Sequence, residues 1–170
     1  MIDSQQPDFS CPRCRASVTK EDTYCRNCGA LFSEGMFCSN HDSAQADGVC
    51  VICLKAFCGK CGGESHKVFL CNMHWRYEIQ EGMAKVFGST DNVQAQFVTT
   101  TLEQAGYHPF LYSRKFNPTA DLVSISGMMR NYGNHPIVEL KVLVPFSEVL
   151  RAEKTLIEIG LVQHAGSEKE

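Results

Sequence analysis

Residues 38–74 read CSNHDSAQADGVCVICLKAFCGKCGGESHKVFLCNMH, and this stretch decides the fold of the first half of the chain. It contains four pairs of cysteine or histidine residues, and two residues separate the members of each pair. This spacing lets two side chains converge on one cation, and four such ligands form the tetrahedron that Zn²⁺ prefers. The four pairs therefore predict two zinc sites.

The spacing between the pairs indicates how they combine. Only four residues separate Cys53 from Cys58, so the second and third pairs cannot easily fold back on each other to share a cation. We therefore expect an interleaved cross-brace. One zinc ion is predicted to bind Cys38, His41, Cys58 and Cys61, and the other to bind Cys50, Cys53, Cys71 and His74.

The spacing resembles the B-box zinc finger, a compact cross-brace of two zinc ions with a few short strands and turns. The first six ligands follow the B-box pattern. A B-box then has two histidines a few residues after the sixth ligand, whereas here nine residues separate Cys61 from the last pair, Cys71 and His74. The resemblance implies a B-box-like module over residues 36–80. His66 competes with His74 for the last position, but it belongs to no pair with this spacing, so we expect it in a loop.

A second cysteine motif precedes this module. Residues 11–29 read CPRCRASVTKEDTYCRNCG, and the ten residues between the two pairs suit a hairpin that carries one pair at each end. The motif resembles the zinc ribbon, which implies a ribbon over residues 9–32. Its metal ligands would be Cys11, Cys14, Cys25 and Cys28. Arg15 stands where many ribbons have glycine, so we expect a slightly different first turn. The alternative is a thiol-disulfide redox pair, but no βαβ pattern surrounds either pair.

The ligand count supports three zinc ions per chain. All ten cysteines of the 170 residues lie between Cys11 and Cys71, and with His41 and His74 they make three sets of four. In a reducing compartment, so many cysteines indicate metal or redox chemistry rather than disulfides. Because every predicted site is closed by four protein ligands, we expect the zinc to be structural.

The charge balance argues against nucleic acid as the partner. The formal charge is -3, and three zinc ions with ten thiolates would add +6 and -10, which leaves about -7. No apolar run approaches the length that spans a bilayer, and residues 1–10 lack the features of a signal peptide. We therefore expect a cytoplasmic protein with no membrane partner.

The segment between the two cysteine motifs is rich in large apolar residues. Leu31, Phe32, Met36 and Phe37 fall within eight residues. They are predicted either to pack between the modules or to present a docking surface, and ordinary local packing under each cysteine pair is an equal alternative.

The cysteine-free half, residues 83–165, shows a βαββαβ pattern that predicts an α+β ferredoxin-like domain. The strands are expected at 83–88, 107–113, 137–144 and 161–164, and the helices from the N-cap Asp91 to Gly106 and over 146–159. The first helix should bury Val93, Phe97, Val98, Leu102 and Ala105 on one face. The third strand should bury Val138, Leu140, Val142 and Val144 on one face.

The segments LEQAGY, VELKVLV and VPFSEVLRAEKTLIEIG look like a family of prokaryotic signal-transducing domains related in fold to the PII regulators. In PII proteins a long loop binds partners, so the resemblance implies an effector surface on residues 114–136. Its residues would be Arg114, Lys115, Arg130 and Tyr132. Alternatively, residues 122–129 form an extra strand or short helix over the sheet.

No common catalytic motif stands out, since the chain lacks GxSxG, HExxH, Walker A and GxGxxG sequences. We expect a non-enzymatic zinc-binding adaptor or regulatory protein that mediates protein-protein interaction in bacterial signalling. The C-terminal domain could also form a homo-oligomer. Three alternatives stay open: a small-ligand sensor through the C-terminal domain, nucleic-acid binding through the ribbon, and a thiol redox sensor.

Overall fold

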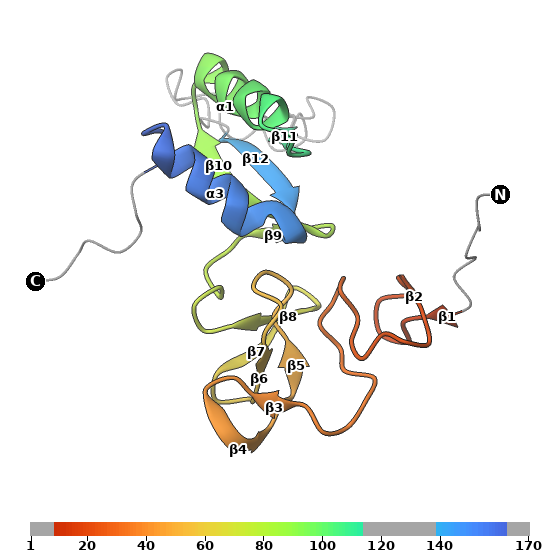
Figure 1. The fold of residues 1–170 in the computed structure, drawn as a ribbon. Helices are drawn as coiled ribbons and strands as arrows, with labels where there is room; N and C mark the ends of the chain where they lie inside the picture. The colour runs from red at the N-terminus through yellow and green to blue at the C-terminus, as the bar shows by residue number, and fades with distance from the viewer. Residues whose placement is uncertain (1–8, 114–138, 163–170) are drawn as a thin grey trace, which may run out of the picture. The chain divides into compact units, whose positions relative to one another are not determined.

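The structure is a computed structural model that describes residues 9–113 and 139–162. Its contacts divide the chain into two compact units, and Figure 1 shows the order of the elements. Unit 1 comprises Met1–Ala84 and Pro145–Leu150, and unit 2 comprises Lys85–Val144 and Arg151–Glu170.

Four short antiparallel hairpins form most of unit 1. They pair β1 (Phe9–Ser10) with β2 (Ser17–Val18), β3 (Phe37–Cys38) with β4 (His41–Gln45), β5 (Gly48–Val49) with β6 (Ala56–Phe57), and β7 (Gly62–Ser65) with β8 (Val68–Cys71). Hairpins of this length are at best marginally stable alone in water. Unit 1 therefore needs a stabilising element beyond its strands.

The first cysteine motif folds differently from its prediction. The sequence predicted one hairpin between the two cysteine pairs. Instead, each pair lies in its own turn: β1 and β2 flank the first pair, and an isolated bridge between Tyr24 and Leu31 flanks the second. Each turn thus brings two thiols to its tip, and the ten residues between the pairs contribute β2 to the first turn and Tyr24 to the second.

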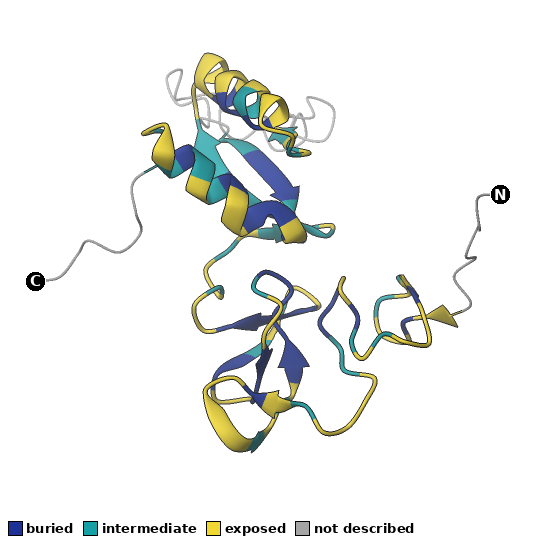
Figure 2. Cartoon of the chain, viewed as in Figure 1, coloured by how far each residue is buried: buried dark blue, intermediate teal, exposed yellow. Residues whose placement is uncertain are grey.

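The aromatic ring of Phe69 lies at the centre of the second module. Phe69 is 4% exposed, and the added Cβ of an alanine at Gly48 would overlap its ring. An added Cβ at Gly62 would lie 2.9 Å from the ring atom Cε1. The two glycines therefore leave the space that the ring fills. Figure 2 shows the buried strands of this module in dark blue.

One four-stranded sheet contains β9 (Ile79–Gln80), β10 (Met83–Ser89), β11 (Phe110–Ser113) and β12 (Leu140–Pro145), in the order β11-β12-β10-β9. The sequence did not predict β9. A two-residue turn joins β9 to β10, with positive φ at both Glu81 (45°) and Gly82 (83°), as a type I′ hairpin requires. The sheet therefore begins before the predicted strand at residue 83.

Helix α1 (Asn92–Gln104) begins as predicted, because the Asp91 carboxylate accepts hydrogen bonds from the amides of Val93 (2.8 Å) and Gln94 (3.4 Å). It also ends as predicted, with Gly106 at φ 83°. The predicted buried face is partly wrong. Val93 and Phe97 are 75% and 57% exposed. Of the predicted residues, Val98 and Leu102 are buried, together with Ala95, whereas Ala105 is also exposed.

Strand β12 also differs from its prediction, since Leu143 is buried together with Val142 and Val144, whereas Leu140 is only half-buried. A strand with buried side chains on successive positions is covered on both faces. A 3-10 helix, η1 (Phe146–Glu148), leads from β12 into helix α3 (Val149–Glu158). The predicted last strand is absent at residues 161–162, which form a bend, and its remainder lies outside the described residues.

The described residues thus contain small cysteine- and histidine-rich modules followed by a sheet with two α-helices. Residues 114–138, with the predicted effector surface and Val138, lie outside the described residues. Within the described ranges, no helix has the length and apolar character that crossing a membrane requires.

Candidate metal centres

Three groups of cysteine and histidine side chains come together in unit 1, and in each group all four ligand atoms lie within 4.8 Å of one another. Set 1 is Cys11, Cys14, Cys25 and Cys28; set 2 is Cys38, His41, Cys58 and Cys61; set 3 is Cys50, Cys53, Cys71 and His74. The structure therefore brings together the same residues that the sequence spacing grouped, including the interleaving of sets 2 and 3. All ten cysteines are free thiols, and each set could hold one metal ion.

His66 lies outside these sets. It occupies the turn between β7 and β8 with Lys67, and its Nδ1 atom lies 2.9 Å from the Ser65 hydroxyl. Both His66 (φ 51°) and Lys67 (φ 66°) adopt the left-handed conformation that this two-residue turn needs. The fourth ligand position of set 3 belongs to His74, whose Nδ1 lies 3.1 Å from Cys71 Sγ.

The distances between ligand atoms in the three sets are equal to those of a tetrahedral zinc site or somewhat shorter. With Zn–S bonds of about 2.3 Å, two sulfurs in a tetrahedron lie about 3.8 Å apart, and a sulfur and a histidine nitrogen about 3.6 Å apart. In set 1, Cys11 Sγ lies 3.8 Å from Cys28 Sγ, and Cys14 Sγ lies 3.4 Å from Cys25 Sγ. In set 2, His41 Nδ1 lies 3.3 to 3.6 Å from the three sulfurs. Both histidines present Nδ1, not Nε2, to their sets.

The backbone holds each C-x-x-C pair in the same turn. In all four pairs, the amide after the second cysteine donates to the carbonyl oxygen of the first. The donors are Arg15 (2.8 Å), Gly29 (2.8 Å), Leu54 (2.8 Å) and Gly62 (3.1 Å). Arg15 (φ 61°) takes the same left-handed conformation as Gly29 (φ 77°). The expected difference in the first turn is therefore not found, because arginine adopts the conformation that glycine adopts in the second turn.

The surroundings shift the pKa values of the thiols in sets 1 and 3 in opposite directions. Burial raises the pKa of Cys14, but hydrogen bonds from the Asn27 side chain and the Ala16 backbone outweigh it and lower the value to about 7. Contact with the Cys53 thiol lowers the pKa of Cys50 to about 3, and the same contact raises the pKa of Cys53. Burial also raises the pKa of Cys28. A bound cation would offset this repulsion among thiolates.

Asn40 supports set 2 from outside the four ligands. Its side-chain Nδ2 donates to Cys61 Sγ (3.4 Å), and its backbone amide donates to Cys38 Sγ (3.5 Å). Hydrogen bonds of this kind orient ligands and reduce the charge on a metal-bound sulfur. Set 2 contains the most exposed ligand, His41, whereas its three cysteines are buried.

Two backbone hydrogen bonds join the set 1 module to the second module. The amide of Val49 donates to the Gly29 carbonyl oxygen, and the amide of Phe69 donates to the Cys28 carbonyl oxygen, both at 2.9 Å. An ion pair between Arg13 and Glu64 (2.5 Å) lies beside them, since Glu64 pairs with Phe69 between β7 and β8. We call the contact between Cys28–Gly29 and Val49/Phe69 the seam.

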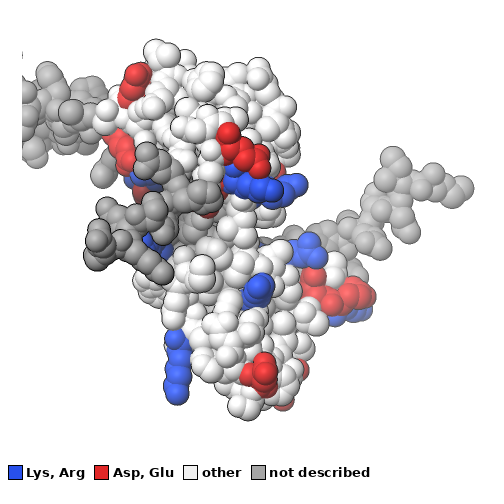
Figure 3. All heavy atoms as spheres, turned by 60° about the vertical axis from the view of Figure 1, so that its left-hand side comes forward, with Lys and Arg blue, Asp and Glu red and all other residues white. Residues whose placement is uncertain are grey.

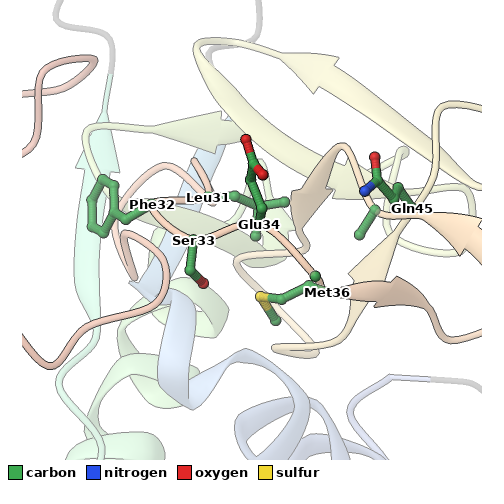
Figure 4. A pocket seen from close by; sticks show the side chains of 8 residues that line it. Leu31, Phe32, Ser33, Glu34, Met36 and Gln45 are labelled. Atoms are coloured by element: carbon green, nitrogen blue, oxygen red, sulfur yellow. The ribbon is translucent and has the colours of Figure 1, made fainter.

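The apolar linker borders a hollow of about 390 Å³, which Figure 4 shows from close by. Leu31 and Met36 are half-buried in it, whereas Phe32 (37%) and Phe37 (54%) are exposed. The lining also includes Ser33, Glu34, Gly35, Gln45 and Ala46. Two of the four large apolar residues therefore face solvent, as a docking surface would require.

On the face that Figure 3 shows, basic side chains are scattered and several lie beside acidic ones. That face offers no continuous basic stripe for a phosphate backbone.

A comparison with models of known protein families, with curated proteins and with solved structures finds no match to this chain.

Proposed function

We propose that sets 1, 2 and 3 each hold one Zn²⁺ ion and that these ions are structural. The observation that carries the proposal is the convergence of ten thiols and two imidazoles into three sets of four, at distances that suit a tetrahedron. Thiolate and imidazole donors favour zinc over the hard cations Mg²⁺ and Ca²⁺, which bind oxygen. Four protein ligands per ion leave no position for a substrate or an activated water.

Zinc would supply the stability that the short hairpins of unit 1 lack. The strands there are two to five residues long, and many of the buried residues are cysteines. In small metal modules the free energy of metal binding becomes free energy of folding. The grouping of set 1 supports a zinc-ribbon-like module, and the interleaving of sets 2 and 3 supports a B-box-like one.

For the region from residue 83 onward we propose a ferredoxin-like arrangement. The order β11-β12-β10 supports it, because the third strand of the predicted βαββαβ pattern then lies between the first and the second. Strand β9 lies at the edge beside β10, where the fourth strand of a ferredoxin-like sheet would pair. Helices α1 and α3 follow the first and third strands in this order.

We further propose that the protein is a non-enzymatic adaptor whose zinc modules contact a protein partner. Unit 1 exposes large apolar side chains that commonly anchor protein interfaces. They are Phe9, Phe32, Phe37, Leu54, Met73 and Trp75, which are 37% to 84% exposed. Phe37 directly precedes Cys38 of set 2, so its position depends on the metal module.

Site-specific photo-crosslinking tests this adaptor role. A benzophenone amino acid replaces Phe37 (54% exposed) in one full-length protein and Phe97 (57% exposed) in a matched control. The adaptor account predicts one defined crosslinked protein from position 37 that is absent from position 97. The crosslink should disappear when Cys38→Ser removes a ligand of set 2. Crosslinking of equal yield and pattern at both positions would contradict a docking role for unit 1.

A further inference from the structure

The seam connects a ligand of set 1 to the backbone that carries two ligands of set 3. Cys28 belongs to set 1, and its carbonyl oxygen accepts the hydrogen bond from Phe69, which lies two residues before Cys71. The neighbouring Gly29 carbonyl accepts the bond from Val49, which directly precedes Cys50. Cys50 and Cys71 are both members of set 3.

A third hydrogen bond closes the network on the other side of Cys50. The amide of Val51 donates to the Phe69 carbonyl oxygen at 3.1 Å. Val49, Val51 and Phe69 are 1%, 1% and 4% exposed. Water therefore cannot readily replace a lost partner, and an unpaired buried amide is costly.

Gly29 allows the two modules to approach this closely. An added Cβ at Gly29 would overlap the Val49 carbonyl oxygen and lie 2.9 Å from Phe69 Cβ. Hydrogen bonds and an ion pair link residues 9–32 to Val49, Glu64 and Phe69 of the second module, and among the described residues none of these bonds ends on a ligand of set 2. Set 2 is linked to set 3 instead, because the Asn72 amide donates to the Cys61 carbonyl oxygen at 2.9 Å.

We infer that metal binding at set 1 and metal binding at set 3 are energetically coupled across the seam, so that occupancy of either set raises the affinity of the other. This inference rests on the proposed metal binding. A metal in set 1 fixes the turn that presents the Cys28 and Gly29 carbonyl groups, and these groups fix the backbone on both sides of Cys50. No hydrogen bond of the seam ends on a ligand of set 2, so set 2 should respond less than set 3. Because coupling between sites is reciprocal, removal of either metal should weaken the other by the same factor.

The test uses full-length protein loaded with ¹¹³Cd²⁺, which binds the same ligands as Zn²⁺. Correlation spectra between ¹¹³Cd and cysteine Hβ protons identify each ion by its ligands, and titration with a chelator gives the midpoint of metal loss for each set. In Cys14→Ser, which removes a ligand of set 1, set 3 should lose its metal at a chelator concentration at least about fivefold lower than in the wild type. The midpoint of set 2 should shift less.

If the loss of a ligand unfolds the module, a second variant that alters the seam but keeps every ligand still tests the coupling. Gly29→Ala retains all twelve ligands but displaces Val49 and Phe69, so sets 1 and 3 should each bind more weakly. Gly35→Ala is the matched control, because Gly35 also has positive φ (95°) but no atom within 4 Å of an added Cβ. Gly35→Ala should leave the three midpoints unchanged.

The measured midpoints distinguish failure of the coupling between sets 1 and 3 from failure of metal binding itself. A midpoint of set 3 that is unchanged in both Cys14→Ser and Gly29→Ala would overturn the coupling while leaving metal binding intact. Equal shifts at sets 2 and 3 would also overturn it, because they would indicate general destabilisation. A wild-type protein that binds no cadmium would contradict the proposed metal binding itself.

Discussion

The backbone amide of Phe69 donates a 2.9 Å hydrogen bond to the carbonyl oxygen of Cys28. The side chain of Phe69 fills the core of the second module, and the side chain of Cys28 belongs to set 1. One residue therefore connects the packing of one module to a candidate metal ligand of the other. The seam makes the two modules a single structure rather than independent zinc fingers on a tether.

Replacement of Gly29 should destabilise unit 1 more than replacement of Gly35. Both glycines have positive φ, so alanine costs about 1 kcal/mol at either position through backbone strain. At Gly29 the new methyl group also collides with Val49 and Phe69, which should raise the total to about 2–4 kcal/mol. Urea unfolding followed by the fluorescence of Trp75, the chain's single tryptophan, measures both variants in unit 1. Equal costs would show that the seam is not tightly packed.

Phe69 and Gly48 should show strong non-additivity. Phe69→Ala should cost about 3–5 kcal/mol, because it empties the centre of the module. Gly48→Ala alone should also destabilise the module, because its methyl group overlaps the Phe69 ring. In the double variant the methyl group enters the vacated space, so the second substitution should cost less than it does alone. Costs that simply add would contradict the contact between ring and glycine.

The N-cap of α1 provides a test in unit 2. Asp91→Ala removes the acceptor for the amides of Val93 and Gln94 and should cost about 1 kcal/mol, whereas Asp91→Asn should cost little. Hydrogen exchange of the α1 amides should therefore be faster in Asp91→Ala and near wild type in Asp91→Asn. If both variants exchange at the wild-type rate, the cap contributes nothing to the helix.

The interleaving of sets 2 and 3 predicts different losses for two neighbouring cysteines. Cys53 and Cys58 are separated by four residues but belong to different sets. In the cadmium-loaded protein, Cys53→Ser should remove or shift the resonance correlated with Cys71, and Cys58→Ser the one correlated with Cys38. If both variants affect the same resonance, the two cysteines share one ion and the cross-brace is wrong.

The sequence predicted the three sets because spacing alone limits which ligands can meet. The four residues between Cys53 and Cys58 disfavour a shared site, and two-residue spacing distinguishes His74 from His66. The helix ends were also predictable, since Asp91 and Gly106 act within one turn of the chain. These features depend only on local geometry.

What the sequence did not predict depends on contacts between distant segments. Val93 and Phe97 fit the apolar stripe of a helix, but α1 turns the face with Ala95 and Val98 inward. The burial of Leu143 requires cover on the second face of β12, which no alternation pattern reveals. The role of Gly29 depends on Val49 and Phe69, which lie 20 and 40 residues further along the chain.

The central claim is tested most directly by the metal content of the full-length protein. Native and denaturing mass spectra are recorded for reduced protein that is purified without a chelator. We predict three zinc ions per chain in the native spectrum, and loss of the fold of unit 1 when a chelator removes them. A native spectrum with two zinc ions or fewer, together with thiols that react with an alkylating reagent, would contradict the account. That result would instead favour a redox role for the unliganded cysteines.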